Sequence, residues 1–336
     1  MKIAVLGLGF MGSTHLKALR SIPEATLCAV FSNDERALEG DLSHIQGNLG
    51  GPGERFDFTA IKKYRDVGAL LADPEIDAVD ICLPTFLHAP VALQALRGGK
   101  HVLVEKPLAL TGADADELLA EARRRNLVLM SAQVLRFFSQ YRVLRDTLPA
   151  LGHVRHAFFR RRCAAPVWSK WLHDKSKSGG GVFDLLIHDI DVALWLFGLP
   201  SRVSAIGSED LERGIDLLTA TLFYADGSTV TISGGWHHPK SYPFSMEYTV
   251  VADGGTIEYS SAGRPPTLYK ADGSETPLEL AEADGYVEEI RYFVQCATAN
   301  RRPELCPPES SVEAVKLALL LDKARDKNGE IIPCHL

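Results

Sequence analysis

The sequence lacks several features that would place the chain in a special class of protein. No stretch approaches the ~18 consecutive apolar residues that a membrane helix needs, so we expect no membrane span. Lys and Arg do not outnumber Asp and Glu: the formal net charge is -7, and no basic cluster is interleaved with aromatic residues. Binding to a nucleic-acid backbone depends on such cations. We therefore expect no nucleic-acid partner.

Cysteine is sparse and unpaired in its spacing. The chain has six cysteines, and none forms a C-x-x-C pair. Several lie in apolar runs, where a reduced thiol behaves as a small hydrophobe. The N-terminal residues Met1–Leu6 show neither the charged start nor the small-residue cleavage site of a signal peptide. These features predict a cytoplasmic protein with reduced thiols.

What remains is an ordinary globular composition in a long chain. Hydrophobic residues make up 46% and charged residues 24% of the 336 residues, and there is no low-complexity tract. One hydrophobic core seldom serves so many residues, so two domains are expected. We place them at 1–133 and 134–336, with a C-terminal helix that could pack back on the first domain.

The first domain shows an alternation of short apolar runs and helical patterns. Apolar strands with this rhythm are buried on both faces in a doubly wound parallel sheet, an α/β fold. We predict helices over Gly12–Ser21, Pro90–Arg97 and Ala113–Arg125, the last capped by Thr111. The predicted strands are Ile3–Leu6, Leu27–Phe31, Ala78–Leu83, His101–Glu105 and Leu127–Ser131.

After about Leu135 the pattern changes to alternation with a period of two, as in Val154–Arg162. Such alternation, broken by Asp-Gly turns, indicates a large, mostly antiparallel sheet in a second, α+β domain. The turns are Asp226-Gly227, Asp253-Gly254 and Asp272-Gly273; helices are expected over Asp184–Phe197, Tyr286–Ala299 and Val312–Ala324, the last with Ser310 and Glu313 as a capping box.

A glycine motif, Gly7-Leu8-Gly9-Phe10-Met11-Gly12, follows the first predicted strand and opens the first predicted helix. In a Rossmann domain the first glycine permits the turn, the second lets the backbone approach a pyrophosphate, and the third allows close packing. A glycine-rich turn without a ligand is the alternative. The position after a strand favours binding of NAD or NADP, in which Phe10 and Met11 would take part.

The end of the second strand bears on the choice of cofactor. Rossmann domains commonly place an acid there to hold the ribose hydroxyls, but this chain has Ser32. Ser32, Asn33 and Arg36 could donate to a 2′-phosphate, which leans the interpretation toward NADP. Asp34 could substitute for the acid, so NAD stays open, and Arg36 could equally be a solvated helix charge.

Two further segments suggest chemistry. Lys106 follows a buried strand in Glu105-Lys106-Pro107, at the sheet edge where ligands bind in open α/β folds, and Pro107 permits a cis peptide. Asp184 and His188 lie four residues apart on a glycine-led predicted helix, so they share a face as a proton-transfer pair. Solvent exposure of the lysine and an ordinary helical Asp–His contact are the structural alternatives.

At these residues the sequence resembles the Gfo/Idh/MocA family of glucose-fructose oxidoreductase, inositol dehydrogenase and rhizopine-catabolism proteins. The likeness runs nearly end to end and includes His15 after the glycine motif and the run Leu83–His88. It implies an NAD(P)-dependent oxidoreductase that moves a hydride to or from a CH–OH carbon of a sugar, cyclitol or polyol. It also implies a homodimer or homotetramer formed through the second domain's sheet.

The resemblance also implies roles for particular residues. His188 would exchange the hydroxyl proton, Lys106 would stabilise charge on the reacting oxygen, and Asp184 would position substrate and imidazole. The residues implied to line the cofactor site are Leu83, Pro84, Thr85, His88, Glu105, Lys106, Gln133 and Trp171. Leu172 and Leu186 depart from the family pattern, in which an arginine is common at the first position and a glycine or histidine at the second.

Substrate contacts are the least determined part of the site. Candidates are the polar or aromatic residues Arg136, Trp168, Lys170, His237 and Tyr242. We predict no metal, because the adjacent histidines His237 and His238 would point to opposite faces of a strand. Three other functions stay open: a ligand sensor that has lost turnover, an enzyme that uses tightly bound NAD as a transient redox relay, and biliverdin-reductase-like chemistry.

Overall fold

The computed structural model describes residues 1–45, 47, 53–166 and 169–336. They form two compact units, each described here by itself. Unit 1 comprises Met1–Val134 and Asp284–Val312, and unit 2 comprises Leu135–Ala283 and Glu313–Leu336. The segment Asp284–Val312, from the second half of the chain, therefore belongs to unit 1.

Unit 1 contains the predicted parallel sheet. Among its described residues, six strands run in the order β3-β2-β1-β4-β5-β6, with every neighbouring pair parallel. The three-residue edge strand β3 escaped the sequence reasoning because its residues, Lys-Lys-Tyr, are not apolar. The bounds are β1 (Lys2–Leu6), β2 (Thr26–Phe31), β3 (Lys62–Tyr64), β4 (Ala78–Ile81), β5 (His101–Glu105) and β6 (Leu129–Ala132).

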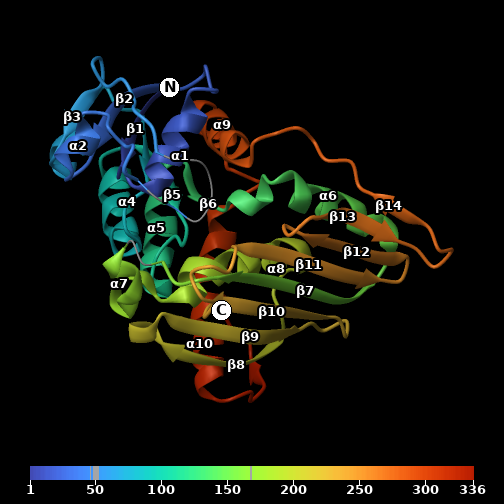
Figure 1. Cartoon of the computed structure of the whole chain (residues 1–336). Coiled ribbons are helices and arrows are strands. Elements are labelled where there is room, and N and C mark those ends of the chain that lie inside the picture. Colours follow the sequence, from blue (N-terminus) through green and yellow to red (C-terminus); the bar gives the residue numbers. More distant parts are fainter. Residues whose placement is uncertain (46, 48–52, 167–168) are drawn as a thin grey trace. The chain divides into compact units, whose positions relative to one another are not determined.

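Helices connect these strands, and one returns from far along the chain. The predicted cap is confirmed: the Thr111 side chain accepts a hydrogen bond from the amide of Asp114. Figure 1 shows the late helix α9 beside α1, and residues of the two helices are in contact. The helices are α1 (Phe10–Leu19), α2 (Glu35–Leu38), α3 (Val67–Leu71), α4 (His88–Arg97), α5 (Gly112–Arg125) and α9 (Gly285–Thr298).

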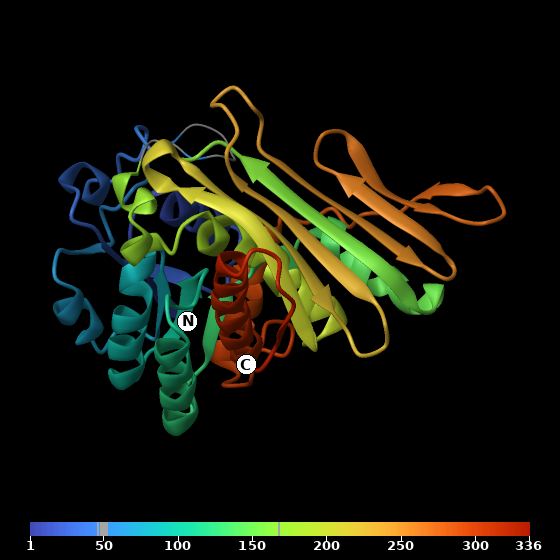
Figure 2. The same cartoon turned by 90° about the horizontal axis from the view of Figure 1, so that it is seen from below.

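Unit 2 is built on one broad sheet (Figure 2). Its described strands follow the order β14-β13-β12-β11-β7-β10-β9-β8-β15, and only the β7–β10 pair is parallel. The three Asp-Gly turns connect β9 to β10, β11 to β12 and β13 to β14, as predicted. The strands are β7 (Val154–Cys163), β8 (Arg202–Asp210), β9 (Ile215–Phe223), β10 (Thr229–Trp236), β11 (Ser245–Ala252), β12 (Gly255–Ser260), β13 (Arg264–Tyr269), β14 (Glu275–Pro277) and β15 (Ile332–Pro333).

Helix α8 (Ile187–Phe197) lies against β7 and β10. The alternation along β7 buries Phe159 and Arg161 on that face, and Arg161 pairs with Asp189 of α8 at 2.7 Å. The remaining helices of unit 2 are α6 (Ser139–Thr147), α7 (Lys175–Ser178) and most of α10 (Pro308–Asp326), which crosses the division between the units.

The capping box predicted at Ser310 and Glu313 is wrong. Helix α10 begins at Pro308, so Ser310 lies inside its first turn and its hydroxyl donates to the carbonyl of Pro307 at 2.8 Å. Proline suits the first helical position because it has no amide hydrogen to leave unbonded there. Because of this preference of proline, the helix starts at Pro308, before the serine that was predicted to cap it.

The sequence predicts reduced cysteines and no membrane-spanning helix. All six cysteines are free in the structure. Among the described helices, none has the combined length and apolar character that crossing a bilayer requires.

Candidate functional site

The glycine motif forms the turn between β1 and α1. Gly7 has a φ of +97°, and a Cβ there would come within 2.5 Å of the Cys82 carbonyl oxygen. A Cβ on Gly12 would lie 1.9 Å from the Gly7 oxygen, so both positions require glycine. A Cβ on Gly9 would meet no described protein atom within 4 Å. Backbone is thus closely packed at the first and third glycines and open at the second.

This arrangement fits the pyrophosphate of a dinucleotide. Helix α1 starts at Phe10 with Gly9 as its N-cap, no side chain caps it, and its first turn carries no acidic residue. Its amide groups and helix dipole are therefore available to an anion. Phe10 and Met11, the predicted cofactor contacts of this turn, are half-buried.

At the end of β2 the polar side chains of Ser32 and Asp34 accept hydrogen bonds from nearby backbone amides. The Ser32 hydroxyl accepts from the amide of Asp34 at 3.1 Å, while Asn33 is exposed. Asp34 accepts from the Arg36 amide and lies 3.2 Å from His44 Nε2. The Arg36 guanidinium donates to Asp41 at 2.9 Å, an exposed ion pair. Asp34, the predicted substitute for the missing acid, thus caps helix α2.

The carboxyl ends of β4 and β5 are neighbours, and one histidine links the loops that follow them. His88 Nδ1 lies 2.7 Å from the Pro107 carbonyl oxygen and its Nε2 lies 2.8 Å from that of Leu83. Burial lowers the pKa of His88, partly offset by the two carbonyls. The side chain is 1% exposed and joins the two loops through these contacts, while the expected role of His88 at the cofactor stays a prediction.

Lys106 follows β5 directly and is half-buried. The Lys106–Pro107 peptide bond is cis, which the sequence had allowed. The Lys106 amide donates to the Glu105 carboxylate at 3.1 Å. Pro84 and Thr85, the other predicted residues of this edge, lie in the loop that His88 anchors, and Thr85 is buried.

A buried chain of charged groups lies behind Lys106. His15 of α1 places Nδ1 2.9 Å from an Asp80 oxygen and Nε2 3.1 Å from Glu105 Oε1. Burial by itself opposes the charged imidazole, yet the carboxylate of Asp80 raises the pKa of His15 well above its usual value. Burial would raise the pKa of Glu105, but the contact between its carboxylate and His15 holds that pKa below its ordinary value. The result is a charged Asp80–His15–Glu105 chain ending at the Lys106 amide.

Sequence reasoning missed Asp80, although its position carries a signal. It is a carboxylate inside the apolar strand Ala-Val-Asp-Ile and is fully buried. His15, Asp80 and Cys82 also form the one group among the described residues whose ligand atoms lie close enough for a metal ion. We interpret the group as a hydrogen-bonded network, because His15 Nδ1 already contacts Asp80 and lies 3.4 Å from Cys82 Sγ.

In unit 2 the two predicted catalytic side chains emerge from one buried helical segment. Val182–Leu186 form a π-helical turn that continues into α8, and single π turns are common at functional sites. Between Gly181 and Ile190, only Asp184 and His188 are half-buried; every other residue is fully buried. Their separation brings both side chains to the exposed side of the segment. Lys106 belongs to unit 1, whereas this pair belongs to unit 2.

Two buried ion pairs fix the orientation of α8. Asp189 pairs with Arg161, and Asp191 pairs with Arg136 at 2.7 Å, with both side chains of the second pair at most 2% exposed. Breaking such pairs leaves an uncompensated buried charge. The guanidinium of Arg136 thus binds the helix that carries His188, and its expected contact with a substrate stays a prediction.

The other predicted residues are dispersed. Gln133 is buried in unit 1, and Trp171 packs on a core cluster of Leu172, Leu185 and Trp236. Lys170 and His237 are exposed, and Tyr242 stacks on His238 at 3.9 Å between ring centroids. Trp168 lies outside the described residues.

Comparison with known proteins agrees with this organisation. The family described as "Oxidoreductase family, NAD-binding Rossmann fold" matches residues 1–133, and the GFO/IDH/MocA C-terminal domain matches residues 148–258. Myo-inositol 2-dehydrogenase of Thermotoga maritima is 29% identical over 98% of this chain and 96% of its own length. UDP-N-acetylglucosamine 3-dehydrogenase of Acidithiobacillus ferrooxidans is 31% identical over 91% of each chain.

A solved structure shows the same fold over the whole length. Levoglucosan dehydrogenase, in complex with NADH and levoglucosan, superimposes with a TM-score of 0.83, covering 99% of each chain at 19% identity. At that identity the likeness concerns the fold.

Proposed function

Since the chain belongs to the Gfo/Idh/MocA family and is an NAD(P)-dependent oxidoreductase, we propose that it moves a hydride between nicotinamide and a CH–OH carbon of a sugar, cyclitol or related polyol. The observation that carries the proposal is that Asp184 and His188 are the two residues of an otherwise buried helical segment, Gly181–Ile190, that keep partial access to solvent. A carboxylate beside an imidazole suits removal of a hydroxyl proton.

In the proposed mechanism each of three side chains has a separate task. His188 takes the hydroxyl proton during oxidation and returns it during reduction. Lys106 donates a hydrogen bond to the reacting oxygen and stabilises its developing negative charge. Asp184 orients the substrate and the imidazole. The dinucleotide, when bound, would supply its nicotinamide ring as the hydride acceptor or donor. The open backbone at Gly9 fits the pyrophosphate of the dinucleotide.

A spectrophotometric assay tests this function directly. The purified protein is supplied with NAD or NADP and a panel of aldoses, inositols, sugar acids and UDP-N-acetylglucosamine, the last chosen from a relative's substrate. We expect reduced nicotinamide to form with at least one compound. His188→Gln should lower kcat by about 10²- to 10⁴-fold, because general acid–base catalysis contributes that much.

The matched control is His153→Gln, which alters a half-buried histidine at a turn of unit 2 and should retain activity. Full activity in His188→Gln would remove the proposed proton-transfer role. Tight dinucleotide binding without turnover in either direction would favour the sensor. Turnover without release of the nucleotide would favour the redox relay.

We further propose that NADP is the preferred cofactor. Ser32 brings no negative charge to the end of β2, and the carboxylate of Asp34 is engaged with the Arg36 amide and His44. A 2′-phosphate would therefore meet a serine hydroxyl where an acid would repel it. Arg36 would have to break its ion pair with Asp41 to reach the phosphate. We therefore expect Ser32 and Asn33 to make the main contacts with a 2′-phosphate.

Ser32→Asp should reverse this preference. The added carboxylate would repel a 2′-phosphate and could accept hydrogen bonds from a free ribose. We expect the ratio of kcat/KM for NAD to that for NADP to rise about 10- to 100-fold, equivalent to about 1.4–2.8 kcal/mol. Ser32→Ala removes the hydroxyl without adding charge and should change the ratio far less. An unchanged ratio in Ser32→Asp would contradict the assignment of this position.

We also propose that unit 2 mediates assembly into a homodimer or homotetramer. Along β7 the residues that alternate with the buried ones, among them Phe158 and Arg160, stay half-buried, and Val251 on the neighbouring strand β11 and Ile206 on β8 are exposed. These apolar and polar side chains are suited to an interface between identical sheets.

A further inference from the structure

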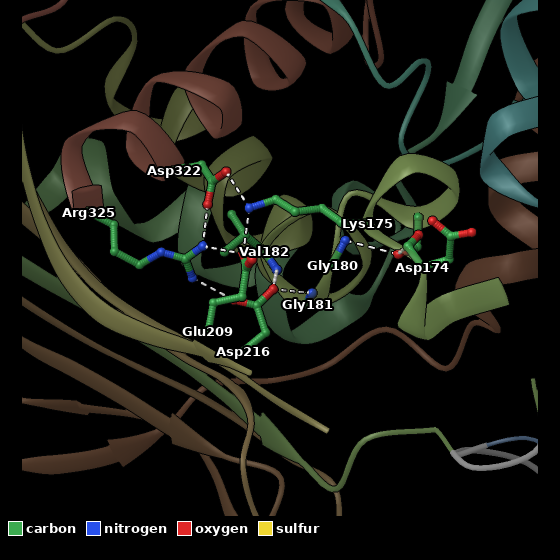
Figure 3. A network of polar contacts seen from close by, with 10 residues as sticks. Asp174, Lys175, Gly180, Gly181, Val182, Glu209, Asp216, Asp322 and Arg325 are labelled. Atoms are coloured by element: carbon green, nitrogen blue, oxygen red, sulfur yellow. Dashed lines mark hydrogen bonds and ion pairs between the residues drawn. The ribbon is translucent and has the colours of Figure 1, made fainter. Parts of the chain in front are cut away.

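Asp216 is a buried carboxylate at the start of β9, and it binds the backbone just ahead of the segment bearing Asp184 and His188. Its side chain is 1% exposed. One oxygen, Oδ2, accepts from the Gly181 amide at 2.5 Å and lies 3.4 Å from the Val182 amide. Figure 3 shows these contacts at the point where the glycine run turns into the helix. The carboxylate therefore occupies the amide end of the π turn.

The glycines of this run are explained by the same contact. Gly179 and Gly180 have φ values of +77° and +84°, which side-chain-bearing residues rarely adopt. A Cβ on Gly180 would lie 2.4 Å from Asp216 Oδ2, and one on Gly181 would lie 3.1 Å from the Trp236 ring. Glycines at these positions let the backbone pass close enough to Asp216 for the Gly181 amide to donate to the buried carboxylate.

A second layer of charges orients Asp216. Its other oxygen, Oδ1, accepts from Arg325 Nη1 of α10 at 2.5 Å, and Arg325 is only 6% exposed. Arg325 also binds Glu209 at 2.7 Å and contacts Asp322 (Figure 3). Lys175 binds Glu209 and Asp322 from the other side. Residues far apart in sequence thus converge on one carboxylate.

We infer that Asp216, oriented by Arg325, is a positioning residue that fixes the rotation of the helical segment carrying Asp184 and His188. The glycine run is tied to this segment by a further hydrogen bond, in which the Gly180 carbonyl accepts from the Asp184 amide at 2.9 Å. A negative group at this end also complements the helix dipole. Because a π turn holds an extra residue, its exact winding decides where Asp184 and His188 point. This inference rests on the proposed function of that pair.

Steady-state kinetics of Asp216→Asn test the inference. The amide keeps the shape but removes the charge that binds both Arg325 and the Gly181 amide. We expect kcat to fall about 10- to 100-fold, since small misplacements of reacting groups cost that much. The dinucleotide Kd should stay within about twofold, because unit 1 is unaltered, and the deuterium isotope effect on kcat with C–D substrate should rise.

Arg325→Met and Lys175→Met provide the matched comparison. Both remove a cation from the same network, but Lys175 contacts Glu209 and Asp322, whereas Arg325 contacts Asp216 directly, as Figure 3 shows. Arg325→Met should lower kcat, Arg325→Lys should recover part of it, and Lys175→Met should leave kcat unchanged. If Asp216→Asn fails to fold, this series decides the question by itself.

Two results would overturn the inference: wild-type kcat in folded Asp216→Asn, or equal losses of kcat in Arg325→Met and Lys175→Met. Failure of the proposed function is a different result, namely full activity of His188→Gln. Trp171, Trp195 and Trp236 lie in unit 2, so tryptophan fluorescence shows whether each variant keeps its fold.

Discussion

Lys106→Met is expected to lower kcat/KM for the sugar or cyclitol about 10³-fold while leaving the dinucleotide Kd within a fewfold of the wild type. Methionine keeps most of the lysine stem, so the packing at the end of β5 is retained and the ammonium alone is lost. Removal of one donor to a developing oxyanion typically costs ~10²–10³ in kcat. Nicotinamide fluorescence titration and initial rates separate binding from catalysis.

The control for this variant is Lys63→Met, which removes an exposed lysine from the edge strand of the same unit. Lys63 pairs with Glu39 on the surface at 2.9 Å, a contact worth little to stability. We expect its activity to match that of the wild type. A Lys106→Met enzyme with undiminished kcat/KM would show that the charge does not act on the reacting oxygen.

His15→Gln is expected to destabilise the protein by about 3–5 kcal/mol. The substitution leaves Asp80 fully buried and Glu105 nearly so without their shared cation, and an uncompensated buried charge costs about that much. Urea denaturation followed by far-UV circular dichroism measures the loss. Adding Asp80→Asn to His15→Gln removes one of the two isolated charges and should restore part of the stability. A double variant less stable than His15→Gln would argue against the charged chain.

The buried Asp80–His15–Glu105 group also predicts how the stability of the protein depends on pH. The pKa of folded His15 lies well above its value in the unfolded chain, about 6.5, so the folded state retains a proton that the unfolded state loses. The contribution of the protonated His15 to the free energy of unfolding is complete below about pH 6.5. It declines as the pH rises through the pKa of His15 in the folded protein, by at most about 1.4 kcal/mol per pH unit. The stability gap between wild type and His15→Gln should therefore narrow above neutral pH. A gap independent of pH would refute a protonated His15.

Local patterns identified the elements that depend on local rules. The glycine motif, the Thr111 cap and the Asp-Gly turns each follow from conformational preferences within a few residues, and the structure has all of them where the sequence indicated. The short strand β3 and the start of α10 were missed or misplaced. The first has no apolar signal, and at the second a proline competed with a serine cap.

The sequence by itself determined the parallel and antiparallel sheets, the dinucleotide turn, and the spacing of Asp184 and His188, because periodicity and glycine placement report on backbone geometry directly. Only the tertiary structure decided which buried charged side chains contact and orient those residues. It joined His15 to Asp80 and Glu105, committed Arg136 to Asp191, and brought Arg325 onto Asp216 across 109 positions of sequence. Buried charges must find partners wherever the fold supplies them, and that choice leaves no periodic trace in the chain.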